Sequence, residues 1–317
     1  MIKGKVVLIG GTGFILSHVA ERYTEMGNEV VIFDNNQEHD MNEETKELIR
    51  ENKNVSFIQG DVRDKEALDA AVKGAEVVYH FAALMGTSAR FRQEIYTTEV
   101  NVIGILNSCQ AALDAGVRYF IHPPRPALST WLTPYIITKT AASQYTQMYH
   151  KVYGLPTIGL LIQNCFGPRE RSVLNPNTLR PGEGRKFIST SIISALKNDP
   201  IPVFGDGEQS SDFFYIDDCV EACMKAACDS GVGETIEIGS GINTKVVDVA
   251  KLIIKLTKSK SKIEFLPMRT GEVKIHTKAN ISAAKKYIGW EPKYTLEEGL
   301  RKTIPYYAKL LGVKAPY

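Results

Sequence analysis

The sequence lacks the features of several protein classes. No apolar stretch approaches the roughly 18 residues that suggest a membrane span, and the first residues lack the basic, apolar and small-residue layout of a secretory signal. No run of Lys or Arg stands out, and 38 basic against 36 acidic residues leave a net charge of +2. We therefore expect a cytoplasmic protein that binds neither nucleic acid nor membrane.

Cysteine is scarce, and its spacing predicts neither disulfides nor a metal site. The five cysteines form no CxxC pair, and buried, reduced thiols are the ordinary role of such residues. Cys219 and Cys223 are four apart and could begin a soft-metal site. His80 and His122 end neighbouring strands, but they lack an acidic or thiol partner at ligand spacing. We expect no metal.

The first 165 residues alternate short β-branched runs with helical patterns. This alternation is typical of βαβ units that build a parallel sheet. Several of the runs are apolar on both faces, as in a sheet that helices cover on each side. We expect strands at 5–10, 29–34, 55–59, 76–81, 118–122 and 156–162.

The pattern changes after residue 165, where a loop rich in Pro, Gly and Arg follows at 168–186. Helices are expected near 187–197, 217–229, 246–257 and 296–310, with a strand near 263–266. A chain of 317 residues can hold a large and a small domain. We expect an α/β fold: a doubly wound parallel Rossmann sheet (1–165) with a smaller C-terminal α/β substrate lobe (166–317), part of which crosses back to the sheet.

A glycine-rich turn follows the first expected strand. Gly10 and Gly13 form a GxxG spacing before a helix, whose first N–H groups can meet a pyrophosphate. Leu16 stands where a third glycine is usual. Because that glycine mainly allows close packing of helix and strand, we expect the helix to shift and dinucleotide binding to survive.

Asp34 ends the second expected strand, where a carboxylate can accept hydrogen bonds from both ribose hydroxyls of a dinucleotide. Its negative charge would repel a 2′-phosphate, and no Arg follows it in DNNQEHD. This favours NAD over NADP as the cofactor. The plainer alternative is that Asp34 only ends the strand.

Tyr135 and Lys139 are four residues apart and would share one face of a helix. Thr133 and Pro134 suit the N-cap and the first position of that helix. An ammonium group near a phenol stabilises the phenolate, which favours proton transfer at a sugar carbinol. The YxxxK spacing is common by chance, and it gains weight from its place one helix after the fifth strand.

The sequence resembles the extended short-chain dehydrogenase/reductase family, the NAD-dependent nucleotide-sugar epimerases and dehydratases, over nearly the whole chain. The resemblance rests on GGTGFI (10–15), FDNN (33–36), GDVRD (60–64), YHFAA (79–83), NVIGILN (101–107), PYIITK (134–139), NCFGPRE (164–170), PVFGDGEQSSDFFYIDD (202–218) and RTGE (269–272). It implies a nucleotide-diphosphate sugar as substrate. It also implies a homodimer paired through helices at about 90–115 and 133–153.

The resemblance implies roles for individual residues. Tyr135 would exchange the proton of the sugar hydroxyl, and Lys139 would also bind the nicotinamide ribose. Asp61 and Val62 would line the adenine pocket. The full set implied to bind NAD is Gly10, Gly13, Phe14, Ile15, Asp34, Asn35, Asn36, Asp61, Val62, Phe81, Ala82, Ala83, Asn101, Tyr135 and Lys139.

The chain departs from the family just before Tyr135. The family ends its fifth strand in a Ser/Thr-rich run whose hydroxyl bonds the reacting oxygen, whereas this strand runs into HPPRPALSTWLTP (122–134). Three accounts fit: Ser129 or Thr130 supplies the hydroxyl, Arg125 donates to the developing oxyanion, or the site is impaired. In the plainer alternative Arg125 is a solvated loop residue. The short loop also predicts that the substrate end of the site is open. We expect this loop to become ordered only when a ligand binds.

On the substrate side the resemblance implies that Asn164, Phe204 and Arg269 contact the nucleotide diphosphate, although Phe204 also suits a core. The family's arginine in QSSDF is Ser211 here, and Arg180 and Arg185 could replace its charge. The expected activity is that of an NAD-dependent nucleotide-sugar 4-epimerase of the UDP-hexose type. Alternatives are a dehydratase or decarboxylase with the same 4-keto intermediate, or a catalytically weak NAD-binding sensor.

Overall fold

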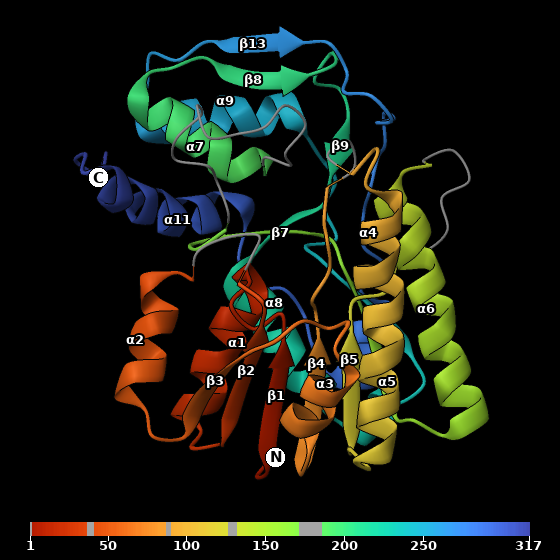
Figure 1. Cartoon of the computed structure of the whole chain (residues 1–317). Coiled ribbons are helices and arrows are strands. Elements are labelled where there is room, and N and C mark those ends of the chain that lie inside the picture. Colours follow the sequence, from red (N-terminus) through yellow and green to blue (C-terminus); the bar gives the residue numbers. More distant parts are fainter. Residues whose placement is uncertain (1, 37–40, 87–89, 126–131, 171–185) are drawn as a thin grey trace.

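A seven-stranded parallel sheet forms the centre of the molecule (Figure 1). The computed structural model describes residues 2–36, 41–86, 90–125, 132–170 and 186–317. The strand order is β11-β6-β5-β4-β1-β2-β3. The strands are β1 (Lys5–Ile9), β2 (Val30–Asp34), β3 (Val55–Gln59), β4 (Ala75–His80), β5 (Tyr119–His122), β6 (Thr157–Ile162) and β11 (Thr235–Ile238). The doubly wound α/β fold and the six expected strands are confirmed, each strand end to within about one residue.

Helices cover both faces of this sheet. Successive side chains of a strand point to opposite faces, so Val6 and Leu8 of β1 lie in one core cluster and Val7 and Ile9 in another. The first cluster packs under α1 (Phe14–Glu25) and α8 (Ile216–Ala226), and the second under α3 (Lys65–Val72), α5 (Gly104–Asp114) and α6 (Pro134–Tyr153). Burial on both faces explains why the strands are apolar throughout.

The helix expected at about 90–115 consists of three consecutive segments. These are α4 (Glu94–Thr98), a π-helical turn (Glu99–Ile103) and α5. The next helix, α6, begins as its sequence predicts: the Thr133 side chain accepts the Ile136 N–H at 3.2 Å, and Pro134 is the first helical residue. Gly154, with a φ of 77°, ends it.

The second half of the chain returns to the sheet. Strand β11 pairs with β6 and adds the seventh strand, which the sequence pattern did not reveal. The core on this face also includes residues of α8 and of α10 (Ser282–Ile288). The chain therefore passes from the sheet to the lobe and back before it ends.

The lobe lies beyond the end of the sheet opposite the N-terminus (Figure 1). There α7 (Phe187–Lys197) and α9 (Val246–Thr257) pack under a parallel pair, β8 (Ile201–Phe204) and β13 (Ile263–Leu266). The remaining elements are α2 (Glu43–Glu51), α11 (Leu296–Leu311), the pair β7 (Asn164–Phe166) and β10 (Phe213–Tyr215), and the pair β9 (Ser210–Ser211) and β12 (Thr244–Lys245).

A buried carboxylate joins segments of the lobe that are distant in sequence. Asp212 follows β9, and its oxygens accept the backbone N–H groups of Ser240 at 2.6 Å, Gly241 at 2.8 Å and Ala279 at 2.9 Å. Such charge-assisted bonds are stronger than neutral ones. Asp212 thus joins three parts of the lobe that are distant in sequence.

The five cysteines are free thiols, and four of them are buried. Burial raises the pKa of Cys219 well above its ordinary value, so this thiol stays protonated. Among the residues that the structure describes, no group of three His, Cys, Asp or Glu side chains is placed to hold a metal ion. Nor does any helix in the described ranges have the length and apolar character needed to cross a membrane.

Candidate dinucleotide and nucleotide-sugar site

The turn between β1 and α1 brings two backbone segments into close contact. Gly10 has a φ of +86°, and a Cβ atom there would lie 2.6 Å from the Ala82 nitrogen. Only glycine satisfies both constraints. The N–H groups of Phe81 and Ala82 donate to the Ile9 carbonyl at 2.9 and 3.0 Å. The structure therefore places the segment after β4 directly beside the glycine turn.

The first turn of α1 fits a phosphate. Its N-cap is Gly13, which has no side chain to cap the first N–H groups, and the first turn contains no acidic residue. Phe14 and Ile15 contribute N–H groups here, and the helix dipole adds partial positive charge. This donor set suits the pyrophosphate of a dinucleotide.

Leu16 fills the space between α1 and the sheet. It is 1% exposed and belongs to the same core cluster as Leu8, Val19 and Ala20. The residue that replaces the usual glycine is therefore a core residue. The expected shift of the helix stays a prediction.

The carboxylate of Asp34 organises the loops around it. It accepts the N–H of Thr12 at 3.2 Å and that of Asn36 at 2.9 Å. Asn36 has a φ of 55°, the left-handed conformation that asparagine tolerates better than most residues. Because each carboxylate oxygen has two acceptor sites, these bonds leave capacity for ribose hydroxyls. Asp34 can therefore both end the strand and bind the hydroxyls of a ribose.

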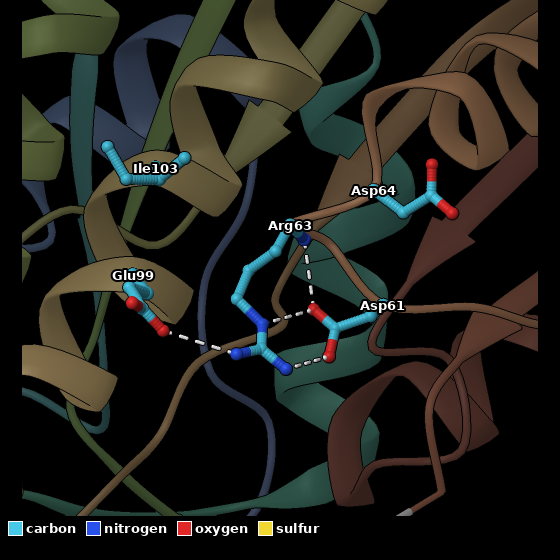
Figure 2. Close-up of a pocket in the computed structure, with 5 residues that line it drawn as sticks. All are labelled: Asp61, Arg63, Asp64, Glu99 and Ile103. Carbon is cyan, nitrogen blue, oxygen red and sulfur yellow. Dashed lines mark hydrogen bonds and ion pairs between the residues drawn. The ribbon is translucent and has the colours of Figure 1, made fainter.

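Arg63 is a residue that the sequence analysis did not anticipate here. It crosses a shallow pocket of about 450 Å³ formed by Asp61, Arg63, Asp64, Glu99 and Ile103 (Figure 2). Its Nε and Nη2 atoms donate to the two Asp61 oxygens at 3.0 and 2.8 Å, and Nη1 lies 3.2 Å from Glu99 Oε2. This hydrogen bonding lowers the pKa of Asp61 below its ordinary value. The Asp61 carboxylate therefore stays charged and fixed in position.

Val62, the other residue implied at the adenine pocket, is buried beside α5. A Cβ atom at Gly104 would lie 2.5 Å from Val62 Cγ2, so the glycine allows the helix to come this close. The Asn107 side-chain amide donates to the carbonyls of Val62 and Arg63, each at 3.1 Å. Asn107 thus fixes this backbone. The sequence feature that could have identified it is its place at the end of NVIGILN (101–107).

Asn101 connects the loop after β4 to the helix that carries Tyr135. Its Oδ1 accepts the Leu84 N–H at 2.7 Å, and its Nδ2 donates to the Leu84 carbonyl at 3.2 Å and to Thr138 Oγ1 at 3.0 Å. Asn101 is 2% exposed and lies in the π-helical turn. The structure gives it a positioning role, and direct contact with NAD stays a prediction.

Tyr135 and Lys139 lie on adjacent turns of α6, Tyr135 partly exposed and Lys139 buried. Burial, and then the charge of Arg125, lowers the pKa of Lys139 from its ordinary value to about 8. Burial, and then the charge of Lys139, lowers the pKa of His122 to about 3. The imidazole is therefore neutral, and Lys139 is mostly protonated at neutral pH.

The structure places Arg125 beside the turn of α6 that contains Lys139. The Arg125 N–H donates to Ser143 Oγ at 2.9 Å, while Ser143 Oγ donates to the Lys139 carbonyl at 2.7 Å. Arg125 is partly buried in the loop after β5, and both its role as a donor and the solvated-loop alternative stay predictions. Ser143 was missed, although it is one turn from Lys139 on the same face. Ser129 and Thr130, the alternative hydroxyl donors, lie outside the described residues.

The substrate-side residues lie on several elements. The Arg269 guanidinium stacks over the Phe204 ring at 4.6 Å, and Glu272 holds it through Nε at 2.9 Å and Nη2 at 2.6 Å. Asn164 is exposed on β7. Ser211 lies in β9 and pairs with Thr244. Arg180 and Arg185 lie outside the described residues.

Comparison with known proteins identifies the family of the chain. The model of the NAD dependent epimerase/dehydratase family matches residues 6–124 and 126–239. A UDP-glucose 4-epimerase of Mycolicibacterium smegmatis is 26% identical over 96% of this chain and 98% of its own. The crystal structure of a Thermotoga maritima UDP-glucose 4-epimerase with UDP-glucose has a TM-score of 0.84, 28% identity and coverage of 97% of this chain and 99% of that one.

A third relative has been crystallised with NAD. The UDP-glucuronic acid 4-epimerase of Bacillus cereus, crystallised with UDP-glucuronic acid and NAD, has a TM-score of 0.82 and 25% identity, and covers 96% of this chain and 99% of its own. The fold and these full-length matches define an enzyme of the extended short-chain dehydrogenase/reductase class. The chain belongs to the NAD-dependent epimerase/dehydratase family.

Gly10→Ala tests the close contact at the glycine turn, with NAD as the probe because the family is NAD-dependent. The new Cβ collides with the Ala82 nitrogen, so the turn must move. We expect NAD affinity, measured by calorimetric titration, to fall by about tenfold or more, the equivalent of about 1.4 kcal/mol. Gly74→Ala is the control, since Gly74 also has a positive φ of 73° but nothing lies within 4 Å of its Cβ position. Equal losses in both variants would contradict the steric role.

Proposed function

We propose that the chain is an NAD-dependent nucleotide-sugar 4-epimerase that acts on a UDP-hexose. The main support is the position of the Tyr135/Lys139 pair: Thr138 between them is hydrogen-bonded to Asn101, whose other bonds hold the loop after β4. The pair is thereby tied to the switch point between β1 and β4, where ligands of doubly wound sheets bind. The named activities of the relatives support the same reaction class.

NAD is the proposed cofactor, and the residues present fit it. The first turn of α1 would hold the pyrophosphate, Asp34 the adenosine ribose, and Asp61 with Val62 the adenine. Lys139 would hold the nicotinamide ribose. Bound NAD would supply the acceptor, and then the donor, of a hydride at C4 of the sugar.

The protein moves the proton. Tyr135 takes the proton of the sugar 4-hydroxyl and later returns it, while the Lys139 ammonium favours the phenolate form through its charge. The ketone formed between these steps stays bound, so that its other face can be presented. The partial exposure of Tyr135 gives the substrate access, whereas the burial of Lys139 keeps water from its ammonium.

Arg125 is the proposed replacement for the missing hydroxyl. Its backbone is bonded to Ser143, and its charge is close enough to Lys139 to lower the pKa of that lysine. A guanidinium in this position can donate to the sugar 4-oxygen as negative charge develops there. The diphosphate would lie against Arg269, which Glu272 and Phe204 hold in place, with Asn164 as a further contact.

We also propose a homodimer paired through α4, α5 and α6. Ile95 and Ile103 are eight residues apart on one continuous helix, as are Ile137 and Tyr145 on α6, and this spacing keeps each pair near one face. The exposed apolar side chains of these helices are Ile95, Ile103, Ile137, Tyr145, Val152 and Tyr153. Such residues are costly on a free surface and suit a helix-packed interface.

Tyr135→Phe tests the proposed activity. Purified protein is mixed with UDP-glucose or UDP-galactose, and we expect interconversion without net accumulation of NADH. The variant should lose activity by about 10³-fold, because the proton acceptor is removed, and should still bind NAD. Unchanged turnover in the variant would contradict the role of Tyr135. A dehydrated or decarboxylated product would instead favour one of the related reactions, and NAD binding without turnover on any nucleotide sugar would favour the sensor.

Arg125→Gln separates two effects of the guanidinium. Activity requires protonated Lys139, so it should fall as the pH rises through about 8, the pKa of that lysine. Removal of the Arg125 charge raises this pKa, and the alkaline limb of the pH–rate profile moves to higher pH. Loss of the donor lowers kcat by about 10²-fold. Arg125→Lys keeps the charge, so its alkaline limb should stay at the same pH as in the unaltered protein. A shift of the alkaline limb to lower pH in Arg125→Gln would exclude the assigned effect of Arg125 on Lys139.

Ile95→Asp tests the homodimer. Sedimentation of the unaltered protein should give a mass of two 35.2 kDa chains. Ile95 is 79% exposed, so a charge there leaves the fold intact and should dissociate the dimer. Ile242→Asp is the matched control, because Ile242 is 61% exposed in the substrate lobe. A monomeric unaltered protein would rule the homodimer out.

A further inference from the structure

A second cavity, of about 200 Å³, lies between α6 and the edge of the sheet. Its floor includes Gly159 of β6, where a Cβ atom would lie 3.1 Å from both Pro124 Cγ and Thr235 Oγ1. The glycine therefore keeps this space open. Lys151 and Thr235 are exposed at the mouth, whereas His122 and Thr157 are buried at the base.

The buried imidazole of His122 is the least expected feature of this cavity. The ring is 6% exposed and lines the cavity, yet it forms no hydrogen bond with the residues that the structure describes. Buried polar groups in proteins almost always have a partner, either in the protein or in a bound molecule. The ring nitrogens of His122 can therefore pair with a molecule inside the cavity.

The other polar groups of the cavity include several hydrogen-bond donors. Gln147 and Lys151 of α6 contribute an amide and an ammonium group, and Thr157 and Thr235 contribute hydroxyls. Within the described part of the chain, none of these four side chains forms a hydrogen bond or an ion pair. A set of converging donors around one ammonium group suits an anion with several acceptor oxygens.

Two features of the cavity oppose an anion. Glu234 contributes one carboxylate, which the Lys151 ammonium balances, whereas the neutral His122 imidazole adds a hydrogen-bonding group and no charge. The last carbonyls of α6 lie near the mouth, but Gly154 N–H donates to the His150 carbonyl at 3.1 Å, and Leu155 N–H to the Tyr149 carbonyl at 3.2 Å. These carbonyls are satisfied within the helix terminus.

We propose that this cavity binds a small oxyanion, a phosphate or a small carboxylate. A cavity of roughly 150 Å³ holds a molecule the size of benzene, so the volume suffices for either. Lys151 is about 24 Å along α6 from Tyr135 at 1.5 Å per residue, so the mouth is separate from the proposed reaction site. Binding here does not depend on the proposed epimerase activity.

Histidine imidazole NMR signals test the proposal directly. The full-length protein is titrated with inorganic phosphate, and separately with acetate, while chloride holds the ionic strength constant. We expect saturable shifts at His122 and His150 and none at His18, His80 or His276, because only the first two line the cavity. Saturation by one anion alone identifies the class of ligand.

Variants then locate the binding. Lys151→Gln should weaken binding roughly tenfold through loss of a charged donor, and His122→Phe should abolish the shift at His150. Lys53→Gln, at an exposed lysine between α2 and β3, is the matched control and should leave the affinity unchanged. The proposal is overturned if neither anion saturates, if all the histidine signals shift together, or if Lys53→Gln weakens binding as much as Lys151→Gln. Thermal unfolding of each variant confirms that it is folded.

Discussion

The buried amide of Asn101 is the contact on which the geometry of the site depends. It binds Leu84 on one side and Thr138 on the other, and so joins the loop after β4 to the helix that carries Tyr135 and Lys139. That loop is in turn pressed against Gly10. The π-helical turn around Asn101 has the wider backbone that often marks functional sites. One side chain therefore sets the glycine turn and α6 relative to each other.

Positive charge and burial together determine the chemistry around Lys139. The lysine is removed from water and lies near Arg125, and both effects favour loss of its proton. The neighbouring His122 is neutral, because burial and the charge of Lys139 lower its pKa. Such an environment is costly for a cation alone but favourable once an anionic group is bound or develops nearby. Arg125 therefore affects the electrostatics around Lys139 whether or not it also donates to a substrate.

Local patterns predicted most of the fold because their causes are local. The strands of the sheet are short β-branched runs buried on both faces, and α6 begins where Thr133 can cap it. Strand β11 was not predicted, because its pairing with β6 is a contact between segments that are distant in sequence. Likewise, nothing in the sequence shows that Ser143 accepts a hydrogen bond from Arg125 or that Arg63 forms an ion pair with Asp61.

The sequence by itself determined the alternation of strands and helices, the glycine turn and the spacing of Tyr135 and Lys139, because each depends on residues close together in the chain. Only the tertiary structure decided which amide joins loop to helix, which charges surround Lys139 and where Gly159 leaves a cavity. Those features arise from contacts between segments far apart in sequence. Side-chain polarity allows many such partners, and packing selects among them.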